Sequence, residues 1–378
     1  MEIFTSYNNI ISPLGFNTEE NYSAVSANKL GVKKINFGKL NDLFCLSVIS
    51  PEAVNEASSQ INNSHLFTKL EKLSIISIQN VLNKSGVSLT DKKTTLIYST
   101  TKGNIDLFEP SSPNLISKKR MYLSEMAGEI GNYFAAVNKP LVVSNACISG
   151  LLSIITAKRF INSGKFENII VCGGDLVSEF TVSGFKSFNA LSVNPCKPFD
   201  AKRDGINLGE AVATILITKN KNLKTNSSMN IVNGASANDA NHISGPSRAG
   251  DGLYKAIQNT FKNNSGIKID FISAHGTATP YNDEMESVAF ERAALNEIPI
   301  NSLKGYYGHT LGAAGVLETI LSIESAFNNK LIKSAGFEIS GVSGKINVVN
   351  ENKTQNVNAI LKTASGFGGC NAAALFVK

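Results

Sequence analysis

Residues 139–160, KPLVVSNACISGLLSIITAKRF, constrain the fold most, because they change from a strand pattern to a helix pattern within a few positions. Leu141 to Val143 form a short apolar run, and after Gly150 the apolar residues recur at helical spacing. Cys147 therefore stands at a strand-to-helix turn, where unpaired N–H groups and the helix dipole favour the nucleophilic thiolate. Free cysteines are also often small buried hydrophobes, and this stretch alone leaves both interpretations open.

Composition predicts a soluble globular protein. The 378 residues are 42% hydrophobic and 17% charged, enough for one large or two medium domains. No apolar run approaches the ~18 residues of a membrane span, and MEIFTSYNNII does not resemble a signal peptide. The five cysteines are scattered without metal-binding spacing. We therefore expect free thiols, no metal and a cytoplasmic location.

The net charge of +6 is spread along the chain. No basic helix with interleaved aromatic residues is present, so the pattern does not indicate nucleic-acid binding. An acidic protein partner or an anionic substrate would suit this charge, and so would a solvated surface. The tightest basic cluster is Lys118, Lys119 and Arg120, and such clusters are usually only solvated.

Strand and helix patterns alternate along the chain, which predicts an α/β fold with a largely parallel or mixed sheet. The clearest strands are expected at 94–100, 167–176, 269–274 and 359–364, and the clearest helices near 66–85, 122–137, 251–263 and 313–328. The polar stretch 219–230 is the best boundary candidate. Residues 141–176 and 299–350 both run strand, turn, helix, strand, which indicates a duplication.

Two of the four histidines lie in similar positions. His275 in FISAHGTATPYND and His309 in KGYYGHTLGAAG both stand beside glycines at expected strand ends, where open α/β folds bind ligands. A single histidine would more often be structural, but two of them together with Cys147 favour a site. His65 and His242 have polar neighbours, and we expect them at the surface.

The sequence resembles the elongating β-ketoacyl-acyl carrier protein synthases of the thiolase-like superfamily. Five motifs carry the resemblance in the family's order: SNACISG around Cys147, PFDAKRDGINLGE at 198–210, HGTATPYNDEMES at 275–287, SLKGYYGHTLGAAGVLE at 302–318 and GFGGCNAA at 366–373. The resemblance implies a thiolase-like fold, with two duplicated α/β halves in a five-layered αβαβα architecture. Residues 1–222 would carry the nucleophile and residues 223–378 the two histidines.

The resemblance also implies a reaction, the decarboxylative condensation of a cysteine-bound acyl chain with malonyl-acyl carrier protein. Cys147 would be acylated, and His275 and His309 would flank the malonyl carboxylate and the developing enolate oxygen. Lys304 and Glu318 would support His309, although an ordinary ion pair is the plainer interpretation. This chemistry requires neither a metal nor a redox cofactor.

Other positions would bind or admit the substrate. Phe367 would act as a gate, and its N–H would form an oxyanion hole with that of Cys147. The remaining substrate-side candidates are Thr277, Thr279, Ile148 and Gly368. For the threonines the plainer role is strand-end capping, and for Phe367 it is core packing. Acyl carrier protein would be the partner, with Lys118, Lys119, Arg120 and Arg203 as docking candidates from their charge.

The sequence departs from the family at three places. Ile148 replaces a usual Ser or Thr, Ala211 and Val212 replace a common glycine pair, and the part before Cys147 is short. Chain-length preference, pathway (fatty acid or a specialised polyene or polyketide) and the choice between homodimer and heterodimer stay open. So do two alternatives: a non-catalytic partner like the chain-length factors, and a CoA-dependent thiolase, for which Cys370 lies near the expected second cysteine.

Overall fold

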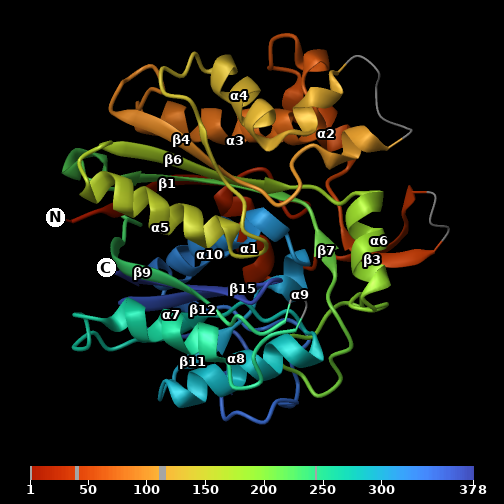
Figure 1. The fold of residues 1–378 in the computed structure, drawn as a ribbon, viewed down its shortest axis with the longest axis vertical. Coiled ribbons are helices and arrows are strands. Elements are labelled where there is room, and N and C mark those ends of the chain that lie inside the picture. The colour runs from red at the N-terminus through yellow and green to blue at the C-terminus, as the bar shows by residue number, and fades with distance from the viewer. Residues whose placement is uncertain (1, 39–41, 110–115, 243–244) are drawn as a thin grey trace.

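The computed structural model describes residues 2–38, 42–109, 116–242 and 245–378. Figure 1 shows a layered arrangement, with helices on the outside, a layer of strands inside each of these and further helices at the centre. The expected αβαβα architecture is confirmed. Among the described residues, no helix combines the length and hydropathy needed to cross a bilayer.

The two halves repeat one topology. In the first, strands run in the order β1-β8-β6-β4-β5, and in the second in the order β9-β16-β15-β10-β11, with β13 added at the edge. A single pairing between β1 and β9 joins the two sets of strands. β4 is parallel to β5 and β6, while β8 is antiparallel to β6 and β1. β10 is likewise parallel to β11 and β15, while β16 is antiparallel to β15 and β9. The matching orders and directions support the duplication indicated by the sequence.

Each half contributes three main helices between equivalent strands. The first half contains β1 (Phe4–Ile11), α3 (Lys69–Ser85), β4 (Thr94–Ser99), α4 (Leu123–Tyr133), β5 (Leu141–Val143), α5 (Ser149–Asn162), β6 (Asn168–Asp175) and β8 (Ala211–Thr218). The second contains β9 (Asn230–Asn238), α7 (Asp251–Phe261), β10 (Phe271–Ser273), α8 (Pro280–Arg292), β11 (Pro299–Asn301), α10 (Ala314–Phe327), β13 (Asn347–Val348), β15 (Ala359–Gly366) and β16 (Cys370–Val377). The boundary predicted at 222/223 lies in the connection between β8 and β9, and the division into two domains stays a prediction.

Smaller elements surround these halves. They are α1 (Thr18–Ser26), β2 (Lys33–Asn36), β3 (Leu43–Ser47), α2 (Pro51–Ser58), the short helix η4 (Lys118–Met121), α6 (Glu179–Ser187), β7 (Leu208–Gly209), α9 (Lys304–Tyr307), the short helix η6 (Leu311–Ala313), β12 (Lys330–Leu331) and β14 (Lys353–Thr354). The three strands β2, β3 and β7 form a separate sheet, which lies beside α6 in Figure 1.

The central helices α5 and α10 are buried between the two sheets and contribute much of the main apolar core. Two glycines let their backbones approach. A Cβ on Gly315 would lie 2.2 Å from the backbone nitrogen of Leu151, and one on Gly150 would lie 2.9 Å from that of Gly315. This contact brings the start of α5, which follows Cys147, against the start of α10, which follows His309.

Candidate active site

A cavity of about 480 Å³ opens between the two halves. Cys147 reaches it from the first half, and His275 and His309 reach it from the second. The cysteine sulfur and a ring nitrogen of each histidine all lie within 4.8 Å of one another. The structure thus brings Cys147 together with two histidines that follow it by more than a hundred positions in the sequence.

Cys147 sits on a tight turn between β5 and α5. Ile148 is the N-cap of α5, so the sulfur precedes the first helical turn as expected. Ala146 has a φ of 44°, a left-handed conformation that costs energy for a residue with a side chain. Gly366 passes so close that a Cβ there would lie 2.9 Å from the Cys147 nitrogen. The turn therefore fixes the thiol at the base of the cavity.

The expectation of an easily ionised thiol needs correction. Burial and, to a lesser extent, the neighbouring Cys370 raise the pKa of Cys147 to about 12, against the smaller opposing effects of Lys304 and the Phe367 N–H. The helix start alone does not offset the cost of placing a thiolate at a buried position. The resting cysteine is a thiol and needs a nearby base to become a nucleophile.

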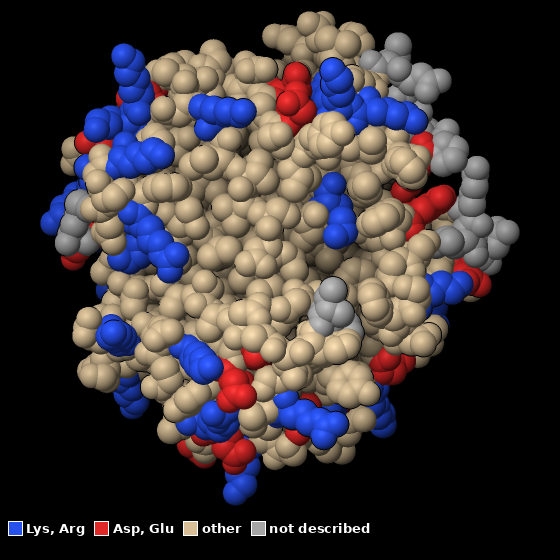
Figure 2. Space-filling view, viewed as in Figure 1, with Lys and Arg blue, Asp and Glu red and all other residues tan. Residues whose placement is uncertain are grey.

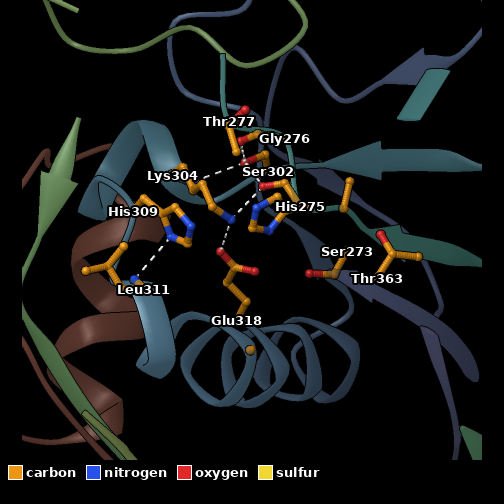
Figure 3. Close-up of polar contacts among 12 residues, drawn as sticks. Ser273, His275, Gly276, Thr277, Ser302, Lys304, His309, Leu311, Glu318 and Thr363 are labelled. Carbon is orange, nitrogen blue, oxygen red and sulfur yellow. Dashed lines mark hydrogen bonds and ion pairs between the residues drawn. The ribbon is translucent and has the colours of Figure 1, made fainter. Parts of the chain in front are cut away.

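The two imidazoles lie almost perpendicular, with ring centroids 5.0 Å apart and an interplanar angle of 81°. The backbone N–H of Leu311 donates to His309 Nδ1 over 3.1 Å, a bond drawn in Figure 3. This bond assigns the neutral tautomer of His309, with its proton on Nε2. His309 Nε2 and His275 Nδ1 are buried and have no hydrogen-bond partner within the described protein.

Both imidazoles are held neutral. Burial lowers the pKa of His275 and of His309 well below the usual value, and the positive charges of Lys304 and Lys362 lower both further. A neutral imidazole can accept a proton at one nitrogen and donate a hydrogen bond from the other. The pair can therefore take the thiol proton or stabilise an oxyanion.

Lys304 and Glu318 lie directly behind the histidines. Lys304 Nζ is 2.7 Å from Glu318 Oε1 and donates to the carbonyl of His275 over 2.6 Å; both contacts appear in Figure 3. Lys362, which the sequence analysis missed, is 2.8 Å from the other oxygen of Glu318. By ligand type, the cysteine and histidines could hold a metal ion. However, histidine ligands usually have a carboxylate or carbonyl behind them, whereas two lysines favour an anion.

Two buried acids, also missed, hold the turn that presents His275. Glu286 accepts the backbone N–H groups of His275 and Gly276 over 2.9 and 2.6 Å. Asp283 accepts those of Thr277 and Ala278. Both acids lie in the HGTATPYNDEMES motif. Their spacing of three residues, on one face of α8, was the available signal.

The substrate-side candidates divide into two groups. Thr277, Thr279 and Phe367 line the cavity, and the two threonine hydroxyls share a hydrogen bond of 2.8 Å. Phe367 is 42% exposed and stacks on Phe185 with centroids 5.6 Å apart, so it stands at the opening and is not a core residue.

Ile148 and Gly368 do not line this cavity. As the N-cap of α5, Ile148 is fully buried in the core between the sheets. The Gly368 carbonyl instead accepts the side-chain amide of Asn238. Neither residue therefore makes a contact in this cavity that would support a substrate-binding role.

The docking candidates also divide. Lys118 and Lys119 are exposed on η4, but Arg120 is paired with the buried carboxylate of Glu71. Arg203 donates to the carbonyls of Asp200 and Gly341 over 3.0 and 2.6 Å. Two of the four candidates thus have structural partners. Figure 2 shows basic and acidic residues intermixed along the margin of one face, around a largely uncharged centre. His65 and His242 are exposed, as expected.

Comparison with known proteins gives consistent matches. The family model described as Beta-ketoacyl synthase, N-terminal domain matches residues 71–222, and the one described as Beta-ketoacyl synthase, C-terminal domain matches residues 229–338. A mitochondrial protein of Schizosaccharomyces pombe, provisionally named a 3-oxoacyl-(acyl-carrier-protein) synthase, is 32% identical over 71% of this chain and 67% of its own length. A 3-oxoacyl-(acyl-carrier-protein) synthase 2 of Coxiella burnetii is 26% identical over 71% and 69%.

Among solved structures, a ketosynthase from Xenorhabdus doucetiae, in complex with its chain length factor, matches with a TM-score of 0.85 and 22% identity. The match covers 100% of this chain and 98% of that one. At this identity the likeness concerns the fold, and it extends over both halves.

Proposed function

The chain belongs to the beta-ketoacyl synthase family, and we propose that it joins an acyl chain carried on Cys147 to malonyl-acyl carrier protein with loss of CO2. The observation that carries the proposal is one cavity containing a thiol and two neutral imidazoles, all within 4.8 Å. Lone nucleophiles and lone histidines have many roles, but this set matches the two half-reactions of a condensing enzyme.

The first half-reaction is acyl transfer. A neutral imidazole takes the Cys147 proton, and the sulfur attacks the acyl thioester carbonyl of the carrier. The N–H groups of Cys147 and Phe367 donate to the tetrahedral oxyanion. The carrier thiolate leaves and takes the proton back from the imidazole. Because both imidazoles are near the sulfur, either can act as this base.

The second half-reaction is decarboxylation and condensation. The malonyl thioester oxygen accepts hydrogen bonds from His275 and His309, so the charge released with CO2 is stabilised as an enolate. The enolate carbon attacks the acyl carbonyl on Cys147 and forms the new carbon–carbon bond. The Cys147 sulfur then leaves and takes a proton from a neighbouring imidazole N–H, and that imidazole recovers a proton from solvent. Both imidazoles are needed here, because each supplies one donor.

Acyl carrier protein is the partner this chemistry requires. We expect the acyl chain and the malonyl unit to arrive on it, through the opening beside Phe367. We also infer a dimer, with a second copy or a related subunit, because β5 ends the strand order with an unpaired edge and is only half buried. We place the reaction in the cytoplasm, where the nucleophilic thiol stays reduced.

Intact-mass analysis after incubation with acyl-loaded carrier proteins of varied chain length tests the proposal. The protein should gain the mass of the acyl group, and peptide mapping should place it on Cys147. The Cys147→Ala variant should gain nothing. A folded protein that gains no acyl group from any carrier would instead support the non-catalytic partner role, and condensation without malonyl-carrier would support a thiolase.

A further inference from the structure

Lys362 is a fully buried lysine in the middle of β15, and its ammonium is surrounded by oxygen atoms. Its Nζ lies 2.7 Å from the Thr363 carbonyl, 3.2 Å from that of Ser273 and 3.4 Å from that of Ala274. The fourth oxygen is Glu318 Oε2 at 2.8 Å. We call these four oxygens the oxygen cage.

Two oxygens of the cage belong to the residues that directly precede His275. Ser273 ends β10, and Ala274 and His275 follow it. Lys362 holds the carbonyls of Ser273 and Ala274, and Lys304 holds that of His275. Two ammonium groups therefore fix three consecutive carbonyls. In Figure 3, Ser273 and Thr363 lie on the far side of Glu318 from Lys304.

Burying this second lysine is costly, since a single carboxylate cannot neutralise two ammonium groups. Lys304, Lys362 and Glu318 together carry a net charge of +1 beside the two imidazoles. A structural ion pair between Lys304 and Glu318 would be complete without Lys362. Its position is explained if the oxygen cage requires a cation, since carbonyl and carboxylate oxygens are the ligands that hard cations prefer.

We propose that Lys362 is a positioning residue whose tethered ammonium acts as a built-in monovalent cation. Its contacts fix the end of β10, which directly precedes His275. Its positive charge also helps to stabilise the enolate that forms when CO2 leaves. The positioning part stands on the contacts alone. The part concerning the anion rests on the proposed function.

A matched pair of variants tests this. Lys362→Ala empties the oxygen cage, so ammonium or K⁺ from solution can enter it. Lys362→Met fills the same space with an uncharged chain, so no ion can enter. Acylation of Cys147, release of CO2 from malonyl-carrier and the thermal unfolding midpoint are measured for both variants and the unaltered protein. Each is measured in ammonium, K⁺ and tetramethylammonium, the last being too large for the cage.

Both variants should still acylate Cys147, while the rate of CO2 release falls by roughly 10- to 100-fold. This range is typical when a residue is replaced that supports a site's ligands without touching the substrate. Ammonium or K⁺ should restore much of this loss in Lys362→Ala only, and should raise its unfolding midpoint more than that of the unaltered protein. Tetramethylammonium should do neither. An alanine variant that folds only in ammonium or K⁺ would also support the proposal.

Wild-type CO2 release by a folded Lys362→Met variant would overturn the proposal, as would an alanine variant that no ion restores or stabilises. If Lys362→Ala does not fold, the methionine variant decides. Failure of both to fold in every salt would also overturn it, because Lys362 would then be needed only for folding. The unfolding midpoint tests the oxygen cage even if the unaltered protein catalyses no condensation. The proposal on Lys362 and the proposed function can therefore be refuted independently of each other.

Discussion

Single residues here owe their chemistry to burial more than to their own type. Cys147 lies before a helix start, which favours a thiolate, yet burial raises its pKa to about 12. His275 and His309 would titrate near neutral pH in water, yet burial and two lysines lower the pKa of each well below that range. The site therefore rests as a thiol beside two neutral bases, and the nucleophile forms only by proton transfer within the cavity.

This resting state predicts the pH dependence of alkylation. Only the thiolate reacts with iodoacetamide, and well below its pKa the thiolate fraction of Cys147 rises with pH. We expect the alkylation rate of Cys147 to increase about tenfold per pH unit between about pH 7 and about pH 9, without a plateau. Peptide mapping by mass spectrometry would follow Cys147 separately from the other four cysteines. A plateau below about pH 8 would mean a preformed thiolate.

At the scale of elements, the contact between α5 and α10 holds the two halves of the site together. A Cβ on Gly315 would lie 2.2 Å from the Leu151 nitrogen, a backbone atom that cannot move alone. The helices would have to separate, and Cys147 and His309 precede the two helix starts that meet there. A change in the packing of α5 against α10 would therefore also change the positions of Cys147 and His309 relative to each other.

Gly315→Ala should therefore lower both stability and activity. We expect a loss of ~1–3 kcal/mol in the free energy of unfolding, typical of an overpacked core, with slower acylation of Cys147. Gly128→Ala in α4 is the matched control, because a Cβ there meets nothing within 4 Å. It should stabilise the protein by ~0.5–1 kcal/mol. Denaturant unfolding and intact mass measure both, and equal effects of the two substitutions would contradict this account.

The short helix η4 gives a second contrast between neighbouring residues. Arg120→Ala would leave the buried carboxylate of Glu71 unpaired, so we expect ~3–5 kcal/mol of destabilisation. Lys118 and Lys119 are exposed, and replacing both with alanine should change stability by less than ~0.5 kcal/mol. If they hold the acidic carrier, the double variant should raise KM for carrier-bound substrate by up to roughly tenfold. Small thioester analogues should be unaffected, and equal effects on both substrates would remove the docking role.

The sequence predicted the strongly patterned elements and failed where tertiary contacts decide. The strand–turn–helix around Cys147 and the helix at 313–328 are confirmed. β9, with the sequence NIVNGASAN, was missed because its residues do not alternate, although it pairs with β16 over most of its length. α6 was missed because EFTVSGFKS has low helix propensity, and a capping box from Ser178 and Thr181 secures its start.

The same limit applies to the site. Residues within the motifs were found, whereas Lys362 was not, although a lysine inside the apolar strand at 359–364 was a visible signal. A buried lysine is explained only by its partners, and these come from β10 and α10. The ion pair of Arg120 was not predicted for the same reason, since its partner Glu71 lies on α3.

At the scale of the whole molecule, duplication accounts for the site. Two copies of one topology pack through α5 and α10, and the proposed nucleophile comes from one copy and the two imidazoles from the other. Neither half alone carries all the side chains that the two proposed half-reactions need. The central claim is therefore that Cys147, His275 and His309 act together, in one cavity, on the acyl chain and the malonyl unit.

A single-turnover experiment on the His309→Ala variant tests that claim most directly, with acyl-loaded and malonyl-loaded carrier supplied in turn. We predict that Cys147 is acylated nearly as in the unaltered protein, because His275 can still take its proton. Release of CO2 should slow by roughly 10²- to 10³-fold, because one of two donors to the enolate oxygen is gone. The unaltered protein should release one CO2 for each β-ketoacyl product. A folded variant that releases CO2 at the unaltered rate would contradict the account.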